Sequence, residues 1–109
     1  MSRTASFKPR SDRPLVVITD FDFGNVSVER EILEAAGAEV VALQAKREED
    51  LLDLAPHCAA MMNQYAKIGR DTITRMQKCE VIARYGVGVD IVDVGTATDK
   101  GILVTNVQN

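Results

Sequence analysis

The chain has 109 residues, of which 46% are hydrophobic and 27% charged, and its formal net charge is −3. Such a length supports one domain with a core of modest size. The thirteen lysines and arginines are scattered, so the sequence lacks the basic patch with which proteins bind nucleic acids. Its apolar stretches are far shorter than the ~20 residues that span a bilayer. We therefore expect neither a nucleic acid nor a membrane as a partner.

The beginning of the chain differs in composition from the rest. Residues 1–14 are polar and basic, include two prolines and lack the apolar segment of a secretory signal. We interpret them as a flexible leader before a single domain at residues 15–109. Two cysteines, Cys58 and Cys79, lie at the edges of apolar runs in that domain. We interpret both as reduced, buried side chains of a cytoplasmic protein, with a disulfide as the alternative.

Apolar runs and helical patterns alternate along the domain. The β-branched run at residues 15–19 (LVVIT) predicts a strand that is buried on both faces, as in parallel sheets. A helix follows, with an N-cap at Asn25 or Ser27 and a stop at Gly37. Its apolar stripe consists of Val28, Ile32, Ala35 and Ala36. The remaining predicted elements are a strand at 39–43, a helix at 46–55, a strand at 58–62, a helix at 69–78, a strand at 81–85, a short helix at 93–100 and a strand at 102–104. This alternation predicts an α/β fold, an open parallel five-stranded sheet with helices on both faces.

The last predicted strand lacks a covering helix in this sequence. Without one, one side of Ile102 and Val104 is left to water or to another chain. We therefore expect either that the chain is part of a longer protein or that a partner supplies the cover. For isolated chains we expect a homodimer.

Ligands of open α/β sheets bind beyond the carboxyl ends of the strands. This rule selects the loops at 20–25, 44–45, 63–67 and 86–90. The first loop contains Asp20 and Asp22 in an Asp-x-Asp pattern, which in a magnesium-dependent phosphotransfer site supplies the nucleophile and the acid/base. Such enzymes also need a lysine and a further acidic pair at other strand ends, but the third predicted strand ends in Asn63, and the only later carboxylates on a suitable loop are Asp90 and Asp93. A capping or turn-forming role for both aspartates is therefore the favoured interpretation.

The loop at 86–90 begins with Gly86-Val87-Gly88, the start of a nucleotide-binding fingerprint. Ile91 occupies the position of its third glycine, and no carboxylate stands about 20 residues beyond the turn to bind a ribose. Two other interpretations remain open. The glycines relieve crowding at a tight turn, or the turn exposes backbone N–H groups that bind a small carboxylate.

Polar residues also follow the third predicted strand. The amides of Asn63 and Gln64 and the phenol of Tyr65 can donate to a ligand oxygen, although surface loops often carry such residues. The only histidine, His57, precedes that strand at the opposite edge of the sheet, so the chain cannot assemble a catalytic histidine with an acidic partner. Arg84, beside the glycine turn, can hold an anion or pair with a carboxylate. Farther along, Asp93 is placed as the N-cap of the short helix.

The last thirty residues resemble the end of the N-terminal segment of D-isomer-specific 2-hydroxyacid dehydrogenases, near the C-terminal-binding proteins and phosphoglycerate dehydrogenases. The matching segments are 82–90 (IARYGVGVD), 92–93, 97–98, 100–102 and 104–107 (VTNV), together with the loop 63–66 (NQYA). Two positions depart from the family pattern, Ile91 where asparagine is common and Gln108 where proline is common. The resemblance implies a flavodoxin-like substrate-binding domain, whose final helix returns after an inserted NAD-binding domain.

The resemblance also implies where a substrate binds. Backbone N–H groups of Val87 and Gly88 would hold the substrate carboxylate, and Asn63, Gln64 and Tyr65 would line the same cleft. The catalytic Arg, Glu and His of the family and its NAD loop belong to the inserted domain, so we expect no catalytic, cofactor-binding or metal-binding residue in this chain.

The sequence as a whole predicts the substrate-binding part of an NAD-dependent oxidoreductase that acts on a small 2-hydroxy or 2-keto acid. Alone, this piece is expected neither to bind NAD nor to turn over substrate. A corepressor-like protein-interaction domain and a phosphotransfer domain built on Asp20 and Asp22 are the alternatives.

Overall fold

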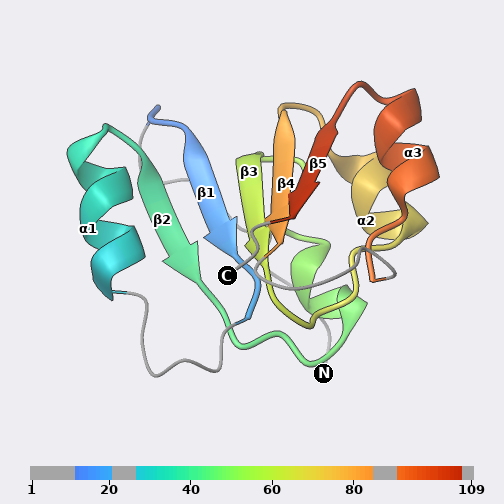
Figure 1. Cartoon of the computed structure of the whole chain (residues 1–109), viewed down its shortest axis with the longest axis horizontal. Coiled ribbons are helices and arrows are strands. Elements are labelled where there is room, and N and C mark those ends of the chain that lie inside the picture. The colour runs from blue at the N-terminus through green and yellow to red at the C-terminus, as the bar shows by residue number, and fades with distance from the viewer. Residues whose placement is uncertain (1–11, 21–26, 85–90, 107–109) are drawn as a thin grey trace.

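The computed structural model describes residues 12–20, 27–84 and 91–106. Strands and helices alternate through these segments as the sequence predicts (Figure 1). In chain order the elements are β1 (Leu15–Ile18), α1 (Ser27–Ala35), β2 (Glu39–Ala42), the 3-10 helix η1 (Glu48–Leu51), β3 (Cys58–Asn63), α2 (Arg70–Arg75), β4 (Val81–Arg84), α3 (Val94–Asp99) and β5 (Leu103–Asn106). None of the helices in these segments is long and apolar enough to cross a bilayer.

The five strands form one parallel sheet in the order β2-β1-β3-β4-β5. The predicted open parallel sheet is therefore confirmed, and its strand order is that of flavodoxin-like folds. The chain moves outward from β1 to β2 and then returns to the other side of β1 with β3. Beyond the carboxyl ends of β1 and β3 the connections diverge, and ligands of such sheets bind at this point.

Helices cover both faces of the sheet, as predicted. Successive strand residues point to opposite faces, so Val17 and Ile18 belong to two different cores. Ile18 packs with Val40 of β2 and Leu33 of α1. Val17 belongs to a larger core that also contains Met61 of β3 and Ile82 of β4, together with Leu51 of η1, Ile73 of α2 and Ala97 of α3. One face therefore has three helical elements over it and the other has α1; Figure 1 shows α1 at the β2 end of the sheet and α2 and α3 at the β5 end.

The prediction that Val28 and Ile32 lie on the buried side of α1 is wrong. Val28 and Ile32 are 64% and 63% exposed. Leu33 packs on the sheet instead, and Nη1 of Arg30 donates to the carbonyl of Val40 over 3.1 Å. The long aliphatic stem of an arginine can cover apolar surface while its charged end reaches a polar partner. A pattern of apolar residues alone therefore does not identify the inner side of this helix.

The segment predicted as a helix at 46–55 forms only the short η1 followed by turns. Oδ2 of Asp50 accepts hydrogen bonds from the backbone N–H groups of Lys46 over 2.9 Å and Arg47 over 3.2 Å, a contact that favours the start of η1. After η1 the carbonyl of Leu51 accepts from Leu54, three residues on, and from Ala55, four residues on, so one turn mixes 3-10 and α-helical bonds. Leu51 and Leu54 are buried, and Leu52 is half-buried.

A carboxylate from η1 holds the start of α2. Oε2 of Glu48 accepts hydrogen bonds from the backbone N–H of Gly69 over 2.8 Å and from the hydroxyl of Thr72 over 2.7 Å. A Cβ on Gly69 would lie 2.9 Å from this carboxylate, so the absence of a side chain permits the contact. The helix is shorter than the predicted 69–78, because the backbone of Met76 is extended and its side chain enters the core.

The last strand is buried on the side that the sequence suggested would be open. Ile102 is only 4% exposed and Val104 packs against the larger core, whereas Leu103 is 62% exposed. The expectation for Ile102 and Val104 is therefore wrong, because these two residues point towards the side of α2 and α3 and Leu103 points to the other side. β5 also runs to Asn106, beyond the predicted end. The homodimer stays a prediction.

Candidate functional site

The loop after β3 is fixed by the carboxylate of Asp20 at the end of β1. Oδ1 of Asp20 accepts hydrogen bonds from the hydroxyl of Thr19 over 2.7 Å and from the backbone N–H of Gln64 over 3.2 Å. Oδ2 accepts one from the backbone N–H of Tyr65 over 2.7 Å. Asp20 is only 7% exposed. Its carboxylate is therefore occupied in holding the neighbouring loop, rather than capping a solvated turn of its own as the sequence suggested.

These contacts bear on the phosphotransfer alternative. Both oxygens of the proposed nucleophile, Asp20, accept hydrogen bonds from the protein, and its expected partner Asp22 lies outside the described residues. In the segments that are described, no group of three or more His, Cys, Asp or Glu side chains converges as a metal site would require. The arrangement around Asp20 supports a structural role.

Asn63 and Arg84 form a buried polar network beneath the same loop. The Asn63 amide nitrogen donates to the hydroxyl of Thr19 over 3.1 Å and to the carbonyl of Ala66 over 2.5 Å, and its oxygen accepts from Nε of Arg84 over 3.0 Å. A terminal nitrogen of Arg84 donates to the carbonyl of Gln64 over 2.5 Å. Both Asn63 and Arg84 are buried. Buried polar groups are costly unless they are paired, so this network ties β1, β3 and β4 into one rigid edge.

A second connection joins the loop after β3 to the segment that follows residues 85–90. The backbone N–H of Ile68 donates to the carbonyl of Ile91 over 2.9 Å, and that of Asp93 donates to the carbonyl of Ile68 over 3.0 Å. Together they form an isolated parallel bridge between Ile68 and Val92. Arg84 and Ile91 are the residues on either side of segment 85–90, and both contact the loop after β3.

Asp93 then begins α3, as the sequence predicts. Its Oδ1 accepts from the backbone N–H of Thr96 over 3.1 Å, and its Oδ2 accepts from the Thr96 hydroxyl over 2.9 Å. These hydrogen bonds favour the ionised carboxylate and lower the pKa of Asp93. The N-cap role of Asp93 is confirmed.

The predicted site residues fall into three groups. Asn63 is fully buried, with its amide engaged inside the protein, so it lies below the loop surface. Gln64 is partly exposed and Tyr65 is 63% exposed, on the loop itself. Val87 and Gly88 lie outside the described residues, and their contacts stay predictions. The sequence thus grouped three neighbouring residues of which only two reach the surface.

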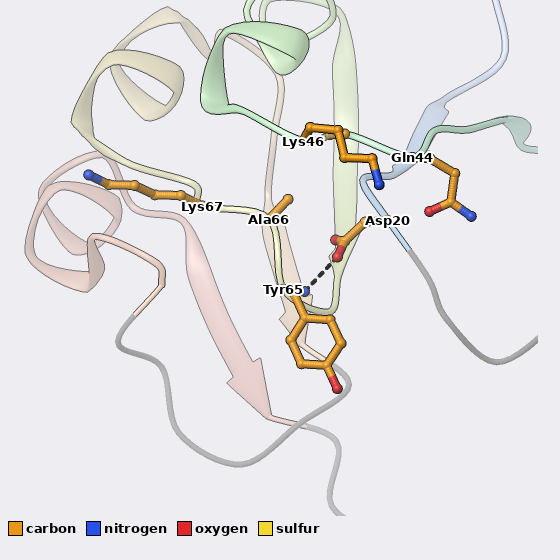
Figure 2. Close-up of a pocket in the computed structure, with 7 residues that line it drawn as sticks. Asp20, Gln44, Lys46, Tyr65, Ala66 and Lys67 are labelled. Carbon is orange, nitrogen blue, oxygen red and sulfur yellow. Dashed lines mark hydrogen bonds between the residues drawn. The ribbon is translucent and has the colours of Figure 1, made fainter.

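An open pocket of about 460 Å³ lies at this edge of the sheet. It is lined by Asp20, Gln44, Ala45, Lys46, Tyr65, Ala66 and Lys67. Figure 2 shows the Lys46 side chain extending between Ala66 and Gln44, whereas the phenol of Tyr65 points away from Asp20. Sequence reasoning selected the loops at 44–45 and 63–67, which include Lys67, but gave that lysine no role and missed Lys46, because their proximity depends on how the loops fold. Figure 2 also shows the Lys67 side chain extending away from the other lining residues, so of the two lysines only Lys46 brings its ammonium group over the pocket, where it could contact an anionic ligand.

Comparison with known proteins identifies the chain's relatives. The family model of the D-isomer specific 2-hydroxyacid dehydrogenase catalytic domain matches residues 16–109. D-3-phosphoglycerate dehydrogenase of Sus scrofa is 41% identical over 81 residues, which cover 73% of this chain and 15% of that protein. C-terminal-binding protein 1 of Caenorhabditis elegans is 32% identical over 106 residues, 95% of this chain and 14% of that protein.

A solved structure agrees with these matches. The NAD⁺-bound 3-phosphoglycerate dehydrogenase of Entamoeba histolytica superposes with a TM-score of 0.76 and 32% identity, over 88% of this chain and 33% of that one. The chain therefore spans only a minor part of the length of the relatives that it matches. With the family model matched from residue 16 onward, this chain belongs to the D-isomer specific 2-hydroxyacid dehydrogenase family.

Proposed function

We propose that this chain is the substrate-binding part of an NAD-dependent 2-hydroxyacid dehydrogenase and that it holds the carboxylate of a 2-hydroxy or 2-keto acid. The observation that carries the proposal is the attachment to the loop after β3 of the two residues that flank segment 85–90. Arg84 donates to the carbonyl of Gln64, and the carbonyl of Ile91 accepts from the backbone N–H of Ile68. Both flanking residues therefore lie next to the loop that the family resemblance assigns to the substrate.

In this proposal the backbone N–H groups of Val87 and Gly88 donate to the substrate carboxylate. Gln64 and Tyr65 contribute from the facing loop, and Asn63 is a positioning residue that holds this loop in place through its contacts with Arg84 and Ala66. The buried guanidinium of Arg84 lies at the start of the turn and adds a positive charge where the carboxylate binds. A rigid arrangement of this kind limits the entropy lost when a small acid binds.

The described residues at Ile91 and α3 do not fit the pyrophosphate of NAD. A dinucleotide fingerprint needs its third glycine at the start of a helix, against which the pyrophosphate packs. Here that position is Ile91, whose carbonyl is hydrogen-bonded to Ile68, and the short helix α3 begins only at Val94. We propose that NAD binds to another part of the enzyme, where hydride would pass between nicotinamide and the second carbon of the acid.

A protein-interaction role is the second candidate. It is supported by the match over 95% of the chain to a protein named for binding a C-terminal segment, and by the exposed Val28 and Ile32 on α1. These residues lie on a helix at the β2 end of the sheet, away from α2 and α3 (Figure 1). A peptide partner that used them would leave the acid-binding loops free.

The two candidates predict different results when the chain is titrated with pyruvate and its backbone amide shifts are followed by NMR. For acid binding we expect the largest shifts at Gln64, Tyr65, Val87 and Gly88. Gln64→Ala should weaken binding about three- to tenfold, because one hydrogen bond is worth about 0.5–1.5 kcal/mol. Gln77→Ala, an exposed glutamine before β4, is the matched control and should change nothing.

Other outcomes would contradict the proposal. Shifts confined to α1, or no response to millimolar pyruvate, would argue against acid binding by these loops. A parallel fluorescence titration with NADH should show no binding to the chain. Micromolar binding of NADH would overturn the assignment of the cofactor to another part of the enzyme.

A further inference from the structure

The two cysteines of the sequence are neighbours across two adjacent strands. Cys58 is the first residue of β3, and Cys79 lies just before β4. The strand register pairs Ala60 with Val81, an offset of 21 residues (81 − 60). Cys58 and Cys79 each lie two residues before this pair, just outside the regular register and at a point where β3 is irregular against β1.

The ladder of hydrogen bonds continues almost to the level of the cysteines. The backbone N–H of Glu80 donates to the carbonyl of Ala59 over 2.9 Å, so the two chains are still paired there. Paired strands lie about 4.7–4.9 Å apart, which is within the Cα separation of about 4.4–6.8 Å that disulfides span. The backbones therefore need no large movement for the two residues to be bridged.

Both side chains also point to the same side of the sheet. Cys58 is a fully buried member of the larger core, and Cys79 packs against that core while remaining partly exposed. Each thiol lies near a carbonyl, Cys58 near that of Ala55 at 3.5 Å and Cys79 near that of Val81 at 3.4 Å. The two thiols thus share one side of the sheet rather than facing opposite sides.

The environments of the two thiols give them different chemical roles. The hydrogen bond with Cys79, together with burial, raises the pKa of Cys58 far above its usual range, whereas the hydrogen bond from Cys58 lowers the pKa of Cys79. Because the thiolate is the reactive form, Cys79 ionises first and is also the side chain that a small oxidant can reach. Cys58 is protected from solvent but can reach the Cys79 sulfur.

We propose that Cys58 and Cys79 are an oxidative modification site at which hydrogen peroxide generates an intramolecular disulfide between β3 and β4. The Cys79 thiolate attacks peroxide, so that an S–O bond forms, the O–O bond breaks and the departing hydroxide takes a proton to become water. Cys58 then loses its proton and attacks the Cys79 sulfur, so that the S–S bond forms and the S–O bond breaks with loss of a second water. Two thiols lose two electrons in total, and peroxide is reduced to two waters.

The disulfide would enclose the loop after β3 and all of α2 within one covalent ring. Residues 59–78 then lie between two linked points, which restricts the unfolded chain more than the folded one. At their other ends the same two strands carry Asn63 and Arg84. Oxidation would therefore reinforce the pair of strands that supports the candidate site, and reduction would release it.

The test is peptide mapping of the full chain after exposure to peroxide, under native conditions and with free thiols then alkylated. Trypsin cuts after Lys67 and Lys78, so Cys58 leaves in peptide 48–67 and Cys79 in peptide 79–84. We expect these two peptides to be joined, the intact chain to lose the mass of two hydrogen atoms while remaining one chain, and dithiothreitol to reverse both changes. This readout uses the unaltered sequence and does not depend on how a variant folds.

Two variants sharpen the order of events. In Cys58→Ser, we expect Cys79 to stop at the sulfenic acid, which dimedone traps. In Cys79→Ser, we expect Cys58 to remain unoxidised at the same peroxide dose. The proposal is overturned if the unaltered chain gives separate peptides with Cys79 overoxidised, if the disulfide links two chains, or if neither cysteine reacts.

Discussion

The two faces of the sheet are stabilised in different ways. On the face covered by η1, α2 and α3, a large core contains fully buried side chains such as Met61 and Ile82. On the other face the core consists of Ile18 and Val40 with a few half-buried neighbours, and α1 leaves Ile32 63% exposed. The first face therefore supplies most of the hydrophobic stabilisation, while the second retains apolar surface.

The candidate site belongs to the better-packed face. Asn63 and Arg84 point to the same side as Met61 and Ile82, since alternate strand residues share a face, and the carboxylate of Asp20 fixes the loop above them. A buried polar network whose groups are satisfied adds rigidity to the part of the protein that it joins. The buried polar network and the larger core therefore lie on the same face, beneath the loop where the proposed ligand binds.

The largest expected effect comes from removing equal amounts of side chain from the two faces. Ile82→Ala deletes a fully buried side chain and should lower the free energy of unfolding by about 2–5 kcal/mol, through lost burial and a cavity. Ile32→Ala, the same change on exposed α1, should cost less than about 0.5 kcal/mol. Urea denaturation of both variants measures the difference. Equal losses would show that the faces contribute alike.

A smaller effect is expected from the polar network. Asn63→Ala removes the acceptor of Arg84 Nε and the donor to the carbonyl of Ala66, while Arg84 keeps its hydrogen bond to Gln64. The loss should lower the free energy of unfolding by about 1–3 kcal/mol. It should also weaken pyruvate binding, because the loop is misplaced. Asn106→Ala is the matched control, because Asn106 pairs with Arg84 in the strand register but is exposed. If both variants had the same stability and affinity, Asn63 would not be a positioning residue.

Most of the fold was predictable because its signals are local. Continuous apolar runs such as residues 15–19 predict buried parallel strands, and each predicted strand is present with its ends shifted by a few residues. The N-cap of α3 was predictable for the same reason, since Asp93 and its partner Thr96 are three residues apart. The inner side of α1 was not, because Arg30 contributes its aliphatic stem and a hydrogen bond to Val40, which lies on another element.

The site was less predictable because its contacts join distant parts of the sequence. The family resemblance identified the residues 63–65. Asn63, however, is buried and accepts a hydrogen bond from Nε of Arg84, 21 residues away, and this contact depends on strand register. The lysines of the pocket, Lys46 and Lys67, come from two loops whose proximity no local pattern encodes. Charge and polarity can nominate such residues, but only the fold decides which of them share a surface.

The smallest expected effect separates a polar helix cap from the apolar core on the better-packed face, through the response of each to pH. Because hydrogen bonds from Thr96 lower the pKa of Asp93 below its usual value of 3.8, the ionised carboxylate stabilises the folded chain above that value. This contribution is lost as the pH falls through the lowered pKa of the folded state. Asp93→Asn should therefore differ most from the unaltered chain near neutral pH and progressively less below pH 3.8.

Urea denaturation at a series of pH values measures this difference. Asp99→Asn removes the same charge from the other end of α3 and is the matched control. The apolar core offers a second comparison, since the loss caused by Ile82→Ala involves no titrating group and should stay constant over the same range. The losses in free energy of unfolding caused by Asp93→Asn and Ile82→Ala could instead be equally insensitive to pH. The cap would then stabilise α3 through its shape rather than its charge.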